Sequence, residues 1–147
     1  MPREFKTILC PTDFSEASYR AIEYGGRFAR VSDGTLLLAH IIHVPSGELY
    51  QHERPTLTFD EARNRARSLL EDIRQKWTDG YSKCEFVVDI GDPYEQLLAI
   101  ATQRHVDLIV TATHGRSGLE HLVMGSVAEK IIRHAPCPVF VVRRGTT

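Results

Sequence analysis

The chain has 147 residues, of which 42% are hydrophobic and 25% charged, and its formal net charge at pH 7 is -1. This length suits one globular unit with a sizeable core, so we expect residues 1–147 to fold as a single domain. The near-neutral charge argues against nucleic acid or an anionic membrane surface as the main partner.

The start of the chain and its cysteines favour a cytoplasmic protein. Residues 1–6 lack the apolar run of a signal peptide, and no segment approaches the ~20 apolar residues of a membrane span. Cys10, Cys84 and Cys137 are far apart, odd in number and outside any CxxC pattern. We therefore expect reduced thiols that pack as small hydrophobes, no redox site and no membrane association.

Short apolar runs alternate with helical patterns along the chain. The runs that predict strands are residues 5–10, 35–44, 83–90, 108–111 and 139–142. Apolar residues at three- and four-residue spacing predict helices that end near residues 31, 77, 104 and 135. The second run (TLLLAHIIHV) is almost uninterruptedly apolar, which is typical of a strand covered by helices on both faces.

Each predicted helix begins near a side chain that can accept a hydrogen bond from the first helical turn. Such a residue with Glu three positions later forms a capping box. The pattern occurs at Asp13/Glu16, Thr58/Glu61, Asp92/Glu95 and Ser126/Glu129. Pro93 directly after Asp92 makes the third start the clearest. At the first helix Ser15 competes with Asp13 for the cap position.

Five strands alternating with four helices predict an α/β fold with one parallel sheet and helices on both faces. Only two strands are followed by unusual residues, Pro11-Thr12-Asp13 after the first and residues 111–115 after the fourth. Ligands of such sheets bind at the carboxyl ends of strands, where the strand order reverses. Placing the first and fourth strands side by side there gives a Rossmann-like sheet of order 3-2-1-4-5.

A glycine-rich loop follows the fourth strand and leads into a helix. Gly115, Gly118 and Gly125 precede the helix that opens at Ser126. Glycine lets the backbone approach a ligand closely, and the first turn of a helix offers unpaired N–H groups with partial positive charge. Strand, glycine-rich loop and helix N-terminus together predict an anion site.

The loop resembles the nucleotide signature of the universal stress protein family, which is Gly, two residues, Gly, nine residues, Gly, then Ser or Thr. Here the motif starts at Ala112, continues at Gly115 and closes with Gly125-Ser126. Pro11 and Asp13 after the opening strand, and the closing segment 135–139, extend the resemblance over the chain. It implies an adenine nucleotide hydrolase-like fold, a role in stress response and binding of ATP, ADP or AMP, with any Mg²⁺ held by the phosphates.

The resemblance also implies where a nucleotide lies. Residues 11–13 would lie near ribose and adenine, and the backbone of Ile41 would contact adenine. Residues 112–118 would surround ribose and the phosphates, and residues 125–127 would contact the terminal phosphates. The implied contacts are Pro11, Thr12, Asp13, Ile41, Ala112, Thr113, His114, Gly115, Arg116, Ser117, Gly118, Gly125, Ser126 and Val127.

Several of these residues have a second interpretation. Asp13 and Ser126 are also good helix caps, and Asp13 taken alone favours capping. Ala112 replaces the first glycine of the motif. If that position needs a positive φ, alanine costs about 1 kcal/mol, whereas a single methyl group beside ribose is tolerable. His114 and His121 share a loop, but their spacing matches no usual metal pattern, so no metal site is predicted.

The sequence favours nucleotide binding over turnover. It contains no GxxxxGK[ST] P-loop and no GxSxG motif, and Glu120 is the only carboxylate in the glycine-rich loop. We therefore expect a regulatory or signalling protein rather than an enzyme. One alternative is a same-fold interaction protein in which Ala112 has weakened or abolished nucleotide binding. A flavin carrier is the weaker alternative, because no aromatic residues flank the loop.

The last predicted strand, about residues 139–142, lies at an edge of the sheet in this order. An open edge invites pairing with another chain. We expect a homodimer through this strand, in line with the family resemblance. Arg143 and Arg144 could instead block such pairing.

Overall fold

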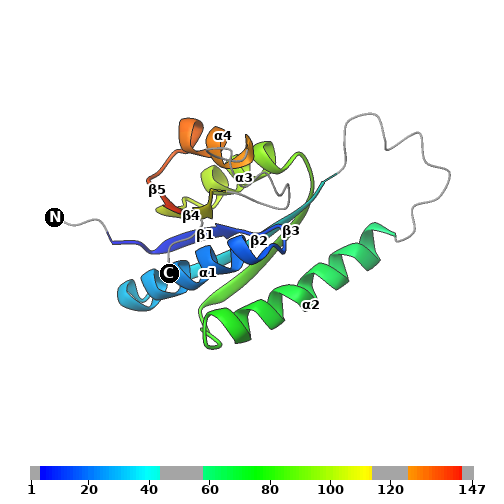
Figure 1. Ribbon diagram of the computed structural model, residues 1–147, viewed down its shortest axis with the longest axis horizontal. Coiled ribbons are helices and arrows are strands. Elements are labelled where there is room, and N and C mark those ends of the chain that lie inside the picture. Colours follow the sequence, from blue (N-terminus) through cyan, green and yellow to red (C-terminus); the bar gives the residue numbers. More distant parts are fainter. Residues whose placement is uncertain (1–3, 44–57, 114–125, 144–147) are drawn as a thin grey trace.

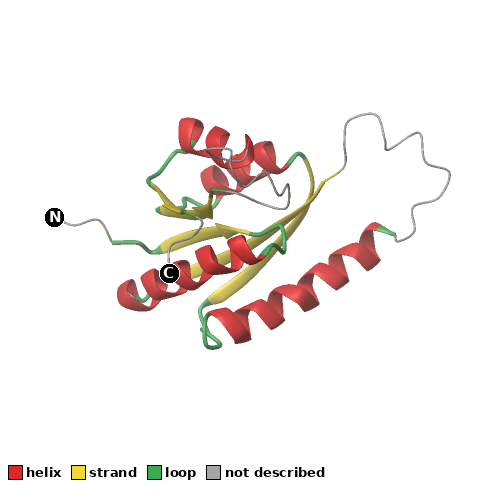
Figure 2. Cartoon of the chain, in the orientation of Figure 1, coloured by secondary structure: helices red, strands yellow, loops and turns green. Residues whose placement is uncertain are grey.

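A computed structural model of the chain describes residues 4–43, 58–113 and 126–143. The described residues form five strands and four helices, which alternate as predicted (Figures 1 and 2). In chain order these are β1 (Thr7–Pro11), α1 (Glu16–Ser32), β2 (Thr35–His43), α2 (Phe59–Trp77), β3 (Cys84–Gly91), α3 (Pro93–Gln103), β4 (Leu108–Ala112), α4 (Ser126–His134) and β5 (Val139–Val142). Over these ranges no helix is both long and apolar enough to cross a membrane.

The strands form one parallel sheet in the order β3-β2-β1-β4-β5, which confirms the predicted topology. α1 and α2 cover one face of the sheet, and α3 and α4 cover the other (Figure 1). From β1 the chain builds outward through β2 to β3, and then returns to place β4 and β5 on the other side of β1. The strand order therefore reverses between β1 and β4.

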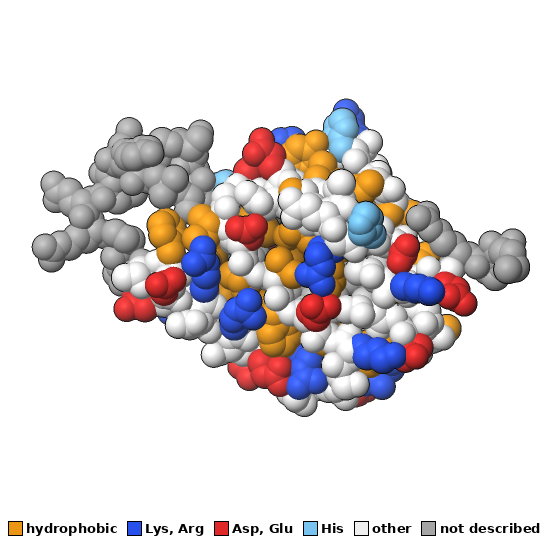
Figure 3. Space-filling view, turned by 180° about the vertical axis from the view of Figure 1, so that it is seen from behind, with side chains coloured by type: hydrophobic (Ala, Val, Ile, Leu, Met, Phe, Trp, Pro, Cys, Tyr) orange, Lys and Arg blue, Asp and Glu red, His pale blue; other side chains and the backbone are white. Residues whose placement is uncertain are grey.

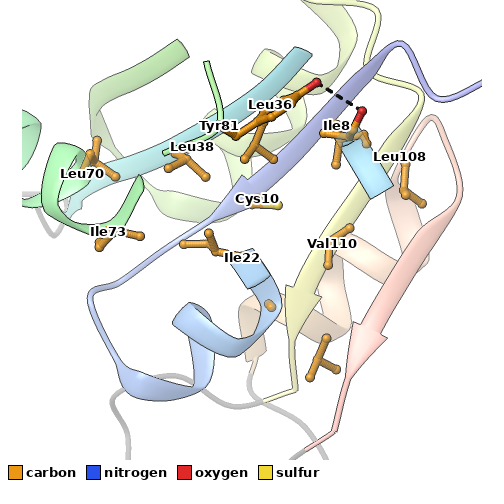
Figure 4. Close-up of a cluster of buried hydrophobic side chains, with 13 residues drawn as sticks. Ile8, Cys10, Ile22, Leu36, Leu38, Leu70, Ile73, Tyr81, Leu108 and Val110 are labelled. Carbon is orange, nitrogen blue, oxygen red and sulfur yellow. Dashed lines mark hydrogen bonds between the residues drawn. The ribbon is translucent and has the colours of Figure 1, made fainter. Parts of the chain in front are cut away.

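Alternate residues of the central strands enter two separate cores. Leu36 and Leu38 of β2 pack with Ile8 toward α1 and α2 (Figure 4), whereas Leu37 and Ala39 pack toward α3 and α4. All five side chains are fully buried. Because both faces of β2 are covered, its sequence is a continuous apolar run instead of an alternating one.

The first core contains a tight contact between β1 and α1. Cys10 Sγ occupies the space that a Cβ atom at Gly25 would need, so glycine is required at this position of the helix. Burial raises the pKa of the Cys10 thiol far above its usual range and that of Cys84 to about 12. Both thiols therefore stay protonated near neutral pH, and both are free, as expected of cysteines that act as small hydrophobes.

The predicted capping interactions are present at the starts of α2 and α3, where Thr58 and Asp92 are the cap residues. Thr58 Oγ1 accepts a hydrogen bond from Glu61 N (3.1 Å), and Glu61 Oε2 accepts one from Thr58 N (3.2 Å), which completes the capping box. Asp92 caps α3 by accepting from Glu95 N (3.0 Å), with Pro93 at the first helical position.

The predicted box at the start of α1 is wrong. Ser15, not Asp13, caps α1, because the chain turns through Phe14 with φ 64° and enters the helix only at Glu16. α4 begins at Ser126 as predicted, and Glu129 Oε1 accepts from Arg133 Nη2 (2.9 Å). Residue 125 before it lies outside the described residues, so the box of Ser126 and Glu129 stays a prediction.

Candidate functional site

β1 and β4 separate at their carboxyl ends. Among the described residues their ladder ends at the pair Leu9 and Ile109. β1 stays paired with β2 as far as Pro11, and β4 stays paired with β5 as far as Ala112. The two backbones therefore part where the strand order reverses, which is where sheets of this kind bind ligands. We call residues 11–13 and 112–113 the switch point.

Thr12 is hydrogen-bonded through both its backbone and its side chain. Its N–H donates to Ala39 O (2.8 Å), which extends the pairing of β1 with β2 by one residue. Its Oγ1 accepts from Phe14 N (3.0 Å) and lies 2.7 Å from Ser18 Oγ in the first turn of α1. The side chain is buried. Thr12 thus joins the end of β1 to the start of α1 from inside the protein.

Asp13 has a role in the turn that differs from the predicted cap. Its Oδ1 accepts from Ser15 N (3.0 Å), while Ser15 Oγ accepts from Ser18 N (3.3 Å) and so caps the helix. The sequence offered two acceptors at nearly equivalent positions, and the left-handed backbone of Phe14 decides between them. Asp13 remains a half-buried carboxylate at the end of β1, where the nucleotide contact was predicted.

His40 and Phe14 complete the β1 side of the switch point, and neither was among the predicted site residues. His40 Nδ1 lies 2.8 Å from Thr12 O, and the His40 and Phe14 rings lie 4.2 Å apart between centroids. One signal was present in the sequence, because His40 is a polar residue inside the apolar run of β2. A buried strand holds such a residue only where it finds a hydrogen-bond partner.

The β4 side of the switch point is built from backbone. Ala112 is paired with Val142 in the β4–β5 ladder, and Thr113 N donates to Val142 O (3.1 Å). Ala112 is not among the residues with positive φ, so its backbone is one that alanine adopts without strain. The possible left-handed strain at this position is therefore absent. The Thr111 and Thr113 side chains are buried at the same end of the strand.

The remaining predicted contacts are divided between described and undescribed parts of the chain. The Ile41 side chain is buried in the core under α3, so only its backbone is available for a ligand. Ser126 is exposed in the first turn of α4, and Val127 packs partly into the same core. His114, Gly115, Arg116, Ser117, Gly118 and Gly125 lie outside the described residues.

The described residues bring together no group of three or more His, Cys, Asp or Glu side chains able to hold a metal ion. His114 and His121 of the glycine-rich loop lie outside those residues. Away from the switch point, a hollow of about 380 Å³ lies between α1 and α2. Its lining includes Tyr19, Ile73 and Trp77, and Leu69 beside them is 38% exposed.

The parallel sheet and the reversal of strand order between β1 and β4 define a doubly wound α/β protein, with the switch point as its candidate ligand site. The sequence model of the Universal stress protein family matches residues 4–143, and the chain belongs to that family. Universal stress protein MJ0577 of Methanocaldococcus jannaschii is 28% identical to this chain in an alignment 159 positions long, which covers 95% of this chain and 96% of that protein.

Solved structures agree with this assignment. The structure of MJ0577 has a TM-score of 0.82 at 29% identity and covers 99% of this chain and 100% of that one. A universal stress protein in complex with cAMP has a TM-score of 0.73 at 23% identity, covering 95% and 98% of the two chains. One from Archaeoglobus fulgidus in complex with dAMP has a TM-score of 0.66 at 18% identity, with the same coverages. At such identities the last two show the shared fold.

Proposed function

We propose that this protein binds an adenine nucleotide, ATP, ADP or AMP, at the switch point. The observation that carries the proposal is the parting of β1 and β4 beyond Leu9 and Ile109, beside the strand-loop-helix segment that ends in the first turn of α4. Related proteins of this fold were solved in complex with cAMP and dAMP, which supports adenine as the base.

Each side of the switch point suits one part of a nucleotide. Residues 11–13 offer backbone groups and the Asp13 carboxylate, which suit the hydroxyl groups of ribose and the donors of adenine. Ile41 contributes its backbone. Ala112 and Thr113, with the loop residues His114, Gly115, Arg116, Ser117 and Gly118, surround ribose and the first phosphates. Gly125, Ser126 and Val127 offer N–H groups to the terminal phosphates, because the first helical turn leaves its N–H groups without intrahelical partners.

We propose a binding role in the cytoplasm rather than catalysis. The sequence lacks a P-loop lysine, and Glu120 is the only carboxylate between Gly115 and Gly125, so nothing in the motif is suited to activating water. Mg²⁺, where present, would be held by the phosphates. A stress-response protein of this kind would signal through its nucleotide-bound state.

A homodimer through β5 is part of this proposal. Phe140 on this edge strand is 37% exposed, although its ring also lies 5.0 Å from that of Phe28, and Ile132 of the neighbouring α4 is 40% exposed. An open strand edge with exposed apolar side chains suits pairing with a second copy. Light scattering at micromolar concentration is expected to give twice the chain mass; a monomer would refute the dimer.

The alternative function is interaction with another protein, with nucleotide binding weakened or lost. The hollow between α1 and α2, with Trp77 in its lining and the exposed Leu69 on α2, favours this alternative. The face in Figure 3 shows positive and negative side chains interspersed, which is compatible with a protein partner and does not favour a polyanion such as nucleic acid.

One experiment separates the two functions. The purified protein is denatured, any released nucleotide is identified by mass spectrometry, and ATP affinity is measured by calorimetry for wild type, Ala112→Gly and Gly125→Leu. Nucleotide binding predicts measurable affinity that Gly125→Leu abolishes, because a side chain there would fill the approach to the phosphates. Absence of binding in wild type that Ala112→Gly restores would instead support the interaction protein.

A further inference from the structure

His40 is a half-buried imidazole in β2 that contacts two residues next to the proposed nucleotide site, Thr12 and Phe14. Its Nδ1 lies 2.8 Å from Thr12 O. A carbonyl oxygen only accepts hydrogen bonds, so Nδ1 must carry the hydrogen and donate it. The His40 ring also lies against the Phe14 ring, with centroids 4.2 Å apart and planes 35° from parallel. The His40 imidazole therefore contacts two parts of the turn after β1, the backbone carbonyl of Thr12 and the aromatic ring of Phe14.

These contacts determine which way the peptide between Thr12 and Asp13 faces. Thr12 N donates to Ala39 O, and Thr12 O accepts from His40, so both groups of Thr12 point toward β2. No described peptide bond is cis, and a trans peptide is planar with its C=O and N–H on opposite sides. The N–H of Asp13 therefore points away from β2, toward the side of β1 where β4 lies.

Phe14 shows that this turn needs support. Its φ of 64° lies in the left-handed region, which costs a residue with a side chain about 1–2 kcal/mol relative to the right-handed conformation. The turn keeps this conformation through Phe14 N, which donates to Thr12 Oγ1 (3.0 Å), and through the Phe14 ring on His40. Without the imidazole, both the Thr12 carbonyl and the Phe14 ring lose a partner.

We propose that His40 is a positioning residue for the nucleotide, which holds the Thr12–Asp13 peptide with its N–H turned toward the switch point. This inference rests on the proposed nucleotide binding. His40 acts through the turn and does not touch the ligand. Because residues 11–13 face the nucleoside end of the nucleotide, loss of His40 weakens binding of the nucleoside part and leaves the phosphate contacts at α4 unchanged.

The test compares three variants of His40 by calorimetry with ATP and with AMP. In His40→Asn the amide nitrogen takes about the place of Nδ1 and can still donate, in His40→Gln the same amide lies one bond further out, and His40→Leu has no donor. We expect His40→Leu and His40→Gln each to lower the affinity for ATP and the affinity for AMP by the same factor. This factor is roughly tenfold, as for the loss of one hydrogen bond. His40→Asn should stay within about threefold of wild type.

The outcomes separate this inference from the function on which it rests. If wild type binds neither nucleotide, both proposals fail together. If wild type binds nucleotide and His40→Leu binds it equally well, His40 is not a positioning residue, while the proposal of nucleotide binding stands. The same conclusion follows if His40→Asn binds nucleotide as weakly as His40→Gln. A lower melting temperature with wild-type affinity would likewise reduce His40 to a stabilising role. Should His40→Leu fail to fold, the comparison of Asn with Gln still decides.

Discussion

The two sides of the switch point are built in different ways. On the β1 side, the side chains of Thr12, Asp13 and His40 hydrogen-bond the turn between the strand and α1, and Ser15 caps the helix. On the β4 side, the described backbone continues a parallel ladder and Thr113 N donates to Val142 O. The β1 side therefore depends on which side chains are present, whereas the β4 side depends on strand pairing that most small residues can provide.

Replacing Thr12 by valine is expected to have the largest effect, because it removes a buried hydroxyl at the centre of the β1 side. Phe14 N would lose its acceptor, and Ser18 Oγ would lose a neighbour at 2.7 Å. We expect Thr12→Val to lower the free energy of unfolding by about 1–3 kcal/mol in urea denaturation, the range for an unsatisfied buried group. Thr12→Ser keeps the hydroxyl and is the matched control; an equal loss in both variants would contradict this explanation.

Replacing the cap of α1 should have an intermediate effect. Ser15 Oγ accepts from Ser18 N, so Ser15→Ala is expected to lower the free energy of unfolding by about 1 kcal/mol. Asp13→Ala should destabilise less, because Asp13 accepts from Ser15 N within the turn instead of capping the helix. Thermal or urea unfolding of the two variants measures the order, and a larger loss for Asp13→Ala would restore Asp13 as the functional cap.

Replacing Ala112 by glycine should have the smallest effect. Ala112 is an extended residue paired with Val142, so glycine relieves no left-handed strain and only adds freedom to the unfolded chain. We expect Ala112→Gly to lower the free energy of unfolding by about 0.5–1 kcal/mol. Its ATP affinity should stay within about threefold of wild type by calorimetry, and a gain of more than tenfold would show that the alanine methyl group obstructs the ligand.

The fold could be predicted because its signals are local and repeated. The apolar run of β2 indicates a strand buried on both faces, and the acceptors at Thr58 and Asp92 lie directly before their helices. Two strand ends with unusual residues were enough to place β1 beside β4. Each of these inferences needs only spacing along the chain and general rules of sheet topology.

The details of the site could not be predicted in the same way. Which of Asp13 and Ser15 caps α1 depends on the φ of Phe14. Whether alanine is strained at position 112 depends likewise on a backbone angle, which the residue type alone does not fix. The pairing of His40 with Thr12 joins residues 28 positions apart, on neighbouring strands. Such contacts follow from register and rotamer, so the sequence indicates only that a polar residue in β2 needs a partner.

The contact between Cys10 and Gly25 has a consequence for how related sequences vary. It fixes how closely α1 approaches β1, and the same helix brings Ser18 to Thr12. A larger residue at position 25 would push the helix outward unless position 10 became smaller. Across the family we therefore expect positions 10 and 25 to covary in volume, with a nearly constant sum, although neither residue lies in the nucleotide motif.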